Sequence, residues 1–125
     1  MALTVSGYSS SNLSYKIATE SNAGATLATN AFADIFGGSG TLYAIDIDHK
    51  ESNTTAYLKL KITSGDVVIG TTQPDLMFEV GASTAVHINI PTGLTFSQLS
   101  FWVTSDPATS HTSDPGETLI TFLCA

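Results

Sequence analysis

Apolar side chains recur at every second position through most of this chain, and that spacing limits what it can fold into. The alternating runs are Leu13/Tyr15/Ile17, Tyr43/Ile45/Ile47, Leu58/Leu60/Ile62, Leu76/Phe78/Val80, Val86/Ile88/Ile90, Leu99/Phe101/Val103 and, last, Ile120/Phe122/Cys124 or Leu119/Thr121/Leu123. In an extended strand neighbouring side chains point to opposite faces, so each run has one apolar and one polar face. Strands of this kind bury their apolar faces against each other, as in packed antiparallel sheets.

Turn-forming residues separate these runs. Gly, Pro, Asp or Ser residues occupy the connections at 64–66, 73–75, 81–83, 91–93 and 106–107. Short strands at regular spacing with such turns are typical of β-sandwiches and barrels. We therefore predict an all-β fold, an antiparallel β-sandwich or jelly roll of about seven or eight strands.

One stretch does not alternate. Apolar residues at Ala28, Ala31, Phe32 and Ile35 have nearly helical spacing, and Gly37 and Gly38 follow. This predicts either one short helix near residues 27–36 or a loop that crosses one end of the sandwich. The chain of 125 residues has the size of one domain. We assign residues 1–12, rich in Ser, to an N-terminal arm and residues 13–125 to a single β-sandwich domain.

The charge balance excludes several partners. Four lysines, no arginine and eleven acidic residues give a formal net charge of −7. Binding to nucleic acid or to an anionic membrane surface needs a basic patch, which this composition lacks. The N-terminus has no basic segment followed by an apolar run, so we expect no signal peptide and synthesis in the cytoplasm of the host. A single cysteine, Cys124, allows no internal disulfide, and we expect it to be a buried small apolar residue.

Few residues have a pattern that indicates chemistry. Asp46 and Asp48 would share one face of a strand, about 7 Å apart, and could bind Ca²⁺ if a third oxygen ligand joined them. The alternative is a solvated face that leads into the turn beginning at His49. His87 alternates with buried positions and should point outward, and His111 lies between two Asp-Pro pairs in a predicted exposed loop. We therefore expect no enzyme, no catalytic residue, no metal site and no cofactor.

Two stretches resemble a known group of proteins. They are residues 34–48 (DIFGGSGTLYAIDID) with 53–60 (NTTAYLKL), and residues 68–76 (VIGTTQPDL) with 88–97 (INIPTGLTFS) and 99–104 (LSFWVT). Together they resemble small β-rich virion proteins of tailed bacteriophages, particularly of cyanobacterial and other aquatic phages. Some of these are capsid cement (decoration) proteins, which sit as jelly-roll trimers on the assembled head. The resemblance implies a structural protein on the capsid surface of a virion, with the major capsid protein as its partner.

This role leads to a set of expected contact residues. We expect a homotrimer whose interfaces use the N-terminal arm (Leu3, Val5 and Tyr8) and the outward aromatics Tyr57 and Trp102. Trp102 follows the inward Phe101 and so should face outward, where it could instead stack on a sugar. The alternative function is therefore an adhesion module, associated with the tail or a head fibre, that binds host-surface glycans. A cupin-like enzyme is a weaker alternative because the three histidines are dispersed.

Overall fold

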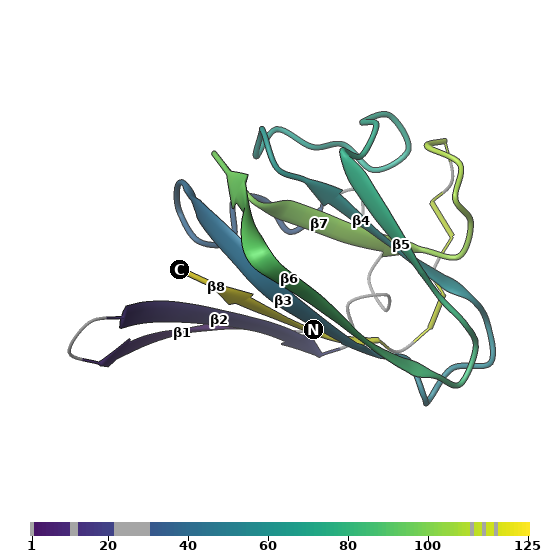
Figure 1. The fold of residues 1–125 in the computed structure, drawn as a ribbon. Helices are drawn as coiled ribbons and strands as arrows, with labels where there is room; N and C mark the ends of the chain where they lie inside the picture. The colour runs from purple at the N-terminus through teal and green to yellow at the C-terminus, as the bar shows by residue number, and fades with distance from the viewer. Residues whose placement is uncertain (1, 11–12, 22–30, 111, 114, 117) are drawn as a thin grey trace.

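The protein folds into two antiparallel β-sheets. The computed structural model describes residues 2–10, 13–21, 31–110, 112–113, 115–116 and 118–125, with side chains from Ala31 onward. The strands are β1 (Ala2–Ser10), β2 (Leu13–Ser21), β3 (Gly40–Asp48), β4 (Ala56–Lys61), β5 (Leu76–Val80), β6 (Ala85–Phe96), β7 (Ser100–Thr104) and β8 (Leu119–Cys124). A five-stranded sheet has the order β1-β2-β8-β3-β6, and a three-stranded sheet has the order β5-β4-β7 (Figure 1). The prediction of an all-β antiparallel fold is confirmed.

The alternating residues form the core between the sheets. Ile45 and Ile47 of β3, Leu58 and Leu60 of β4 and Phe122 of β8 are all at most 1% exposed. The rings of Phe101 in β7 and Phe122 in β8 lie 4.9 Å apart and join the two sheets directly. Burying one such side chain contributes about 1.5–3 kcal/mol, so this shared core is the main source of stability.

Residues 31–36 do not form the short helix that the spacing allowed within 27–36. The backbone of Phe32 instead exchanges two 2.9 Å hydrogen bonds with Phe101, and the two rings stack at 4.7 Å. Asp34 then takes a positive φ of 44° in a turn, and its carboxylate accepts a hydrogen bond from the Gly38 amide. The apolar residues of this stretch thus follow the edge of β7, and none of the described residues is helical. Residues 27–30 lie outside the described residues.

A second difference concerns the predicted turn at residues 91–93, which lies within β6. Asn89 pairs with Ala44 and Leu94 pairs with Leu42, so four residues of β6 oppose Tyr43 alone. Such a bulge re-aims a strand without ending it. Gly93 makes the bulge fit, because its φ is +77° and a Cβ atom there would lie 2.4 Å from Thr41 Cγ2. Pro and Gly therefore mark a bulge here instead of a turn.

Candidate functional site

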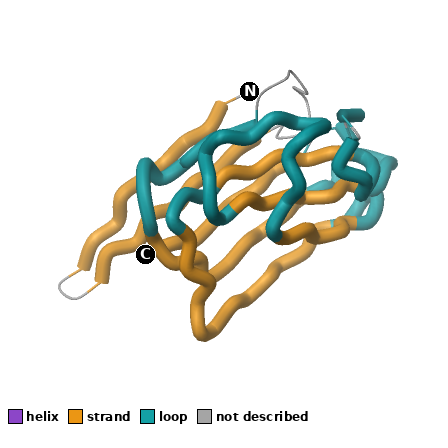
Figure 2. The backbone as a smooth tube through the Cα atoms, turned by 90° about the horizontal axis from the view of Figure 1, so that it is seen from above, coloured by secondary structure: helices purple, strands orange, loops and turns teal. Residues whose placement is uncertain are grey.

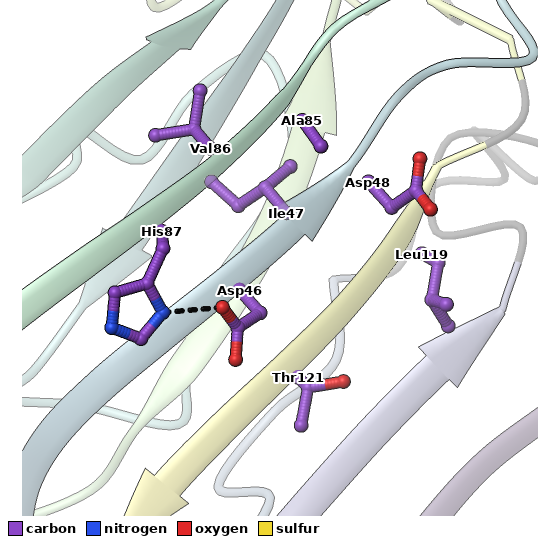
Figure 3. A pocket seen from close by; sticks show the side chains of 8 residues that line it. All are labelled: Asp46, Ile47, Asp48, Ala85, Val86, His87, Leu119 and Thr121. Carbon is purple, nitrogen blue, oxygen red and sulfur yellow. Dashed lines mark hydrogen bonds and ion pairs between the residues drawn. The ribbon is translucent and has the colours of Figure 1, made fainter.

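The outer face of the five-stranded sheet carries a shallow hollow of about 240 Å³. It lies over β3, β6 and β8, and its lining residues are Asp46, Ile47, Asp48, Ala85, Val86, His87, Leu119 and Thr121 (Figure 3). Strand register assembles it, since Asp46 pairs with His87 on one side and with Thr121 on the other. Residues distant in sequence thus form one polar row across three strands.

His87 and Asp46 are paired within this row. His87 Nδ1 donates a hydrogen bond to the Asp46 carboxylate, and the side chains are 58% and 60% exposed. The prediction that His87 points outward is confirmed. A pair with both side chains this exposed contributes at most about 1 kcal/mol to stability, even when the imidazole is charged. The pair presents hydrogen-bonding groups to solvent and so could contact a small polar ligand.

Asp48 lies on the same face of β3, one row further along the strand (Figure 3). Its Oδ1 atom accepts a 3.1 Å hydrogen bond from the Lys50 amide, which ties the carboxylate to the following turn. Ca²⁺ needs six to eight oxygen ligands, most of which a protein site must supply. In the described part of the chain, no three His, Cys, Asp or Glu residues are grouped so that they could hold a metal ion. Both carboxylates lie on the outer face of β3, where the Asp46 side chain is 60% exposed and Asp48 is bound to the turn that follows the strand.

His49 follows Asp48 but is fully buried, at 0% exposure. Its Nε2 donates to the Thr54 carbonyl at 2.6 Å, and its Nδ1 lies 2.8 Å from Thr118 Oγ1. A carbonyl only accepts, so Nε2 carries the hydrogen of that bond, while the Thr118 hydroxyl bonds to Nδ1 and also lies 3.3 Å from the Gly116 carbonyl. Nε2 thus closes the segment that follows β3, and Nδ1 connects this segment to the one before β8, which is a structural role. His111 lies outside the described residues.

Trp102 does not have the exposure that the sequence predicted. It points away from the core between the sheets, as expected, yet it is only 2% exposed, and Lys59, its neighbour across β4 and β7, is 0% exposed. Lys59 Nζ donates a 2.9 Å hydrogen bond to the carbonyl of Ala108, in the loop after β7. Figure 2 shows loops crossing over the strands. The prediction of Trp102 as an exposed contact or a sugar platform is therefore wrong.

Two titratable groups on β4 have shifted pKa values. Desolvation lowers the pKa of Lys59, and the Asp106 carboxylate offsets part of that effect. Desolvation also raises the pKa of Tyr57, with smaller contributions in the same direction from Glu79 and Asp106. Alternation with Leu58 and Leu60 placed Lys59 on the outer face correctly. No local signal showed that a loop some fifty residues later would cover it.

The five predicted contact residues do not form one surface. Leu3, Val5 and Tyr8 lie in β1, the outermost strand of the five-stranded sheet, whereas Tyr57 and Trp102 lie on β4 and β7 of the other sheet. Tyr57 is half-buried beside its strand partners Glu79 and Thr104. A contact surface would therefore use either the β1 edge or the loop-covered sheet.

Comparison with known proteins identifies no relative. No family model matches this chain, and neither do the curated proteins or the solved structures with which it was compared. Among the described residues, no helix has the length and apolar character needed to cross a membrane.

Proposed function

We propose that the domain is a jelly roll. In a jelly roll successive strands alternate between two sheets, except that the fourth and fifth are neighbours in one sheet, and the first strand lies beside the last. We count β2 as the first strand, the bridge at Phe32 as the second, and β3 to β8 as the third to eighth. The large-sheet order β2-β8-β3-β6 then reads first-eighth-third-sixth. The other sheet has the order second-seventh-fourth-fifth, from the Phe32 bridge followed by β7-β4-β5. This order supports a jelly roll in which the Phe32 bridge takes the place of the second strand and β1 is an additional edge strand.

We further propose that the protein is a capsid cement, or decoration, protein of a phage virion, and that it acts as a homotrimer on the major capsid protein. The strand order carries this proposal, because jelly rolls are widespread among viral capsid proteins. The fold alone does not define a function. Two properties of the sequence add support: only 12% of residues are charged, and 33 are Ser or Thr. Short side chains lose little rotamer entropy when a surface is buried.

The chemistry of the described residues supports a structural role over catalysis. His49 uses both ring nitrogens to hold the fold together. The His87–Asp46 pair lies on an open sheet face with both side chains more than half exposed. Enzyme sites are usually enclosed and hold their reacting groups away from water. Multivalent attachment to a lattice, in contrast, needs only modest affinity for each copy.

The test is copy number and position in the parent virion. We expect the chain in hundreds of copies at lattice positions of the head, measured by quantitative mass spectrometry and by a reconstruction at modest resolution. Purified protein added to capsids that lack it should cosediment to saturation and raise the temperature at which the shell opens. A few copies at the tail, or no saturable cosedimentation, would reject the cement role.

A second candidate function rests on the hollow on the outer sheet face. Its carboxylates, imidazole and hydroxyl are groups that bind sugar hydroxyls, which supports an adhesion module for host-surface glycans. A glycan array tests this with Asp46→Asn and His87→Ala. Glycan binding by the parent that both variants abolish would support the adhesion role. Asp66→Asn, which removes one carboxylate at an exposed position outside the hollow, is the matched control and should keep the binding.

A further inference from the structure

The large sheet ends in two strands whose outer edges have no partner among the described strands. These are β1 at one end and β6 at the other. Edge strands expose unpaired backbone groups, and proteins usually protect them with charged residues or with covering segments. The small sheet follows this rule, since β5 carries Glu79 and the Phe32 bridge lies beside β7. β1 and β6 contain no Asp, Glu or Lys, although the chain has a net charge of −7.

The β6 edge borders an open apolar seam. Val86, Ile88 and Ile90 are packed against the core but remain partly exposed. Leu76 and Phe78 of β5, the adjoining edge of the other sheet, are in the same state. Residues 81–84 join β5 to β6, so the two edges lie on one side of the molecule (Figure 1). Along β6 itself, Pro91 lacks an amide donor and lies in the bulge, so the segment able to pair regularly is residues 85–89.

The β1 edge lies on the opposite side, where the large sheet is the wider of the two. The contact between Phe101 and Phe122 places β7 over β8, so β2 and β1 continue the large sheet past β7 (Figure 1). Two strands extend a sheet by about 10 Å. The molecule thus has an extended sheet edge on one side and an apolar seam beside an unpaired edge on the other.

We propose that this chain binds further copies of itself head to tail, with the β1 edge of one copy pairing with residues 85–89 of the next. We take a second copy as the occupant because the chain itself supplies both unpaired edges. Copies of net charge −7 repel each other, but pairing these two edges brings no Asp, Glu or Lys of either strand into the contact. The extension formed by β1 and β2 would then lie beside the seam of Leu76 and Phe78 in the neighbouring copy. A contact between two different surfaces closes into a ring when the rotation permits. This interface rests on the proposed homotrimer and assigns its surfaces.

The test places one lysine on the proposed edge of the full-length chain. Asn89 is exposed and contributes nothing to the core, so Asn89→Lys should fold normally yet charge the pairing segment. We expect the parent to elute as a trimer in size-exclusion chromatography with light scattering, and Asn89→Lys to associate at least 10-fold more weakly. Asn53→Lys makes the same chemical change at an exposed loop position and should remain trimeric. Equal far-UV circular dichroism of all three proteins confirms that folding is intact.

Amide hydrogen exchange locates the contact independently. In the parent, β1 and residues 85–89 should become more protected as protein concentration rises, and Asn89→Lys should lose that protection in both segments. Protection of β6 without β1 would indicate a two-fold contact between like edges and would overturn the proposal. A monomeric parent, or a trimer that survives Asn89→Lys, would overturn it as well. Capsid cosedimentation is measured separately, so a trimeric variant that still decorates capsids rejects this interface and leaves the cement role intact.

Discussion

Replacement of Phe101 by Ala should cause a large loss of stability, because this side chain links the two sheets. Phe101 is fully buried, and its ring contacts both Phe32, at 4.7 Å, and Phe122, at 4.9 Å. A buried Phe→Ala change costs about 3–5 kcal/mol through lost burial and the cavity that remains. Each aromatic pair adds about 0.5–1.5 kcal/mol beyond its buried area, so we expect a loss near the upper limit, about 5 kcal/mol. That is a large part of the roughly 6–19 kcal/mol expected for a domain of this length.

Urea unfolding measures this loss. The single tryptophan, Trp102, is 2% exposed and so should report unfolding through its fluorescence. Phe78→Ala is the matched control, because Phe78 is only partly buried at the β5 edge and should lose less than half as much. Phe101→Leu should lose about 1–3 kcal/mol, since it keeps most of the apolar volume but removes two ring contacts worth about 0.5–1.5 kcal/mol each. A loss for Phe101→Ala below about 2 kcal/mol, or equal to that of Phe78→Ala, would refute the assignment of Phe101 as the link between the sheets.

Three further predictions test local features. His49→Ala should lower the free energy of unfolding by about 2–4 kcal/mol, from two buried hydrogen bonds and the lost ring volume, and a urea midpoint unchanged from the parent would contradict its structural role. Burial alone would raise the pKa of Asp75. Hydrogen bonds from the Ile62 amide and from Lys61 lower the pKa by more than burial raises it, so the net pKa lies below the usual value. The ionised Asp75 carboxylate therefore contributes fully to stability above about pH 4, and this contribution is lost as the pH falls through the lowered pKa. When urea unfolding is measured at about pH 5 and about pH 3, the stability of Asp75→Asn should fall less than that of the parent. Gly93→Ala should lower the free energy of unfolding by at least about 1 kcal/mol more than Gly37→Ala does. Both glycines have a positive φ, but only at Gly93 would the new Cβ atom also meet a neighbouring side chain. Equal thermal midpoints of the two variants would show that the strand can shift to accept the Cβ atom.

The sequence predicted the parts of the fold that depend on local alternation. The runs around Ile45, Leu58, Phe78 and Phe101 lie in strands, and their inward residues form the core, because an apolar face must be buried wherever it occurs. Within residues 1–12, assigned to an arm, Ala2–Ser10 form strand β1, which pairs with β2. Strand order is a different matter, since pairing between β2 and β8 joins segments about a hundred residues apart and leaves no local signal.

The candidate site shows the same division. Alternation placed Asp46, Asp48 and His87 on outer faces correctly, but only the register of β3 with β6 brings Asp46 and His87 together. Alternation also placed Trp102 on the correct face. The predicted exposure of Trp102 was wrong because the loop whose Ala108 carbonyl bonds to Lys59 covers that face. A face determined by period two is a property of one strand, whereas exposure depends on what the rest of the chain packs over it.

The unequal cover of the two outer faces indicates where a partner can bind. On the small sheet, all five residues of β7 are buried: Phe101 and Val103 face the core, and Trp102 faces outward beside Lys59, which bonds to the loop after β7. On the large sheet, Asp46 and His87 lie open on the outer face, and β6 keeps an exposed edge. A partner that bound the small sheet would have to displace the loop and expose the buried ammonium of Lys59, which costs the hydrogen bond to Ala108. A partner that bound the outer face or the edges of the large sheet would meet no such cost, so these surfaces are open to a partner at a lower cost than the loop-covered part of the small sheet.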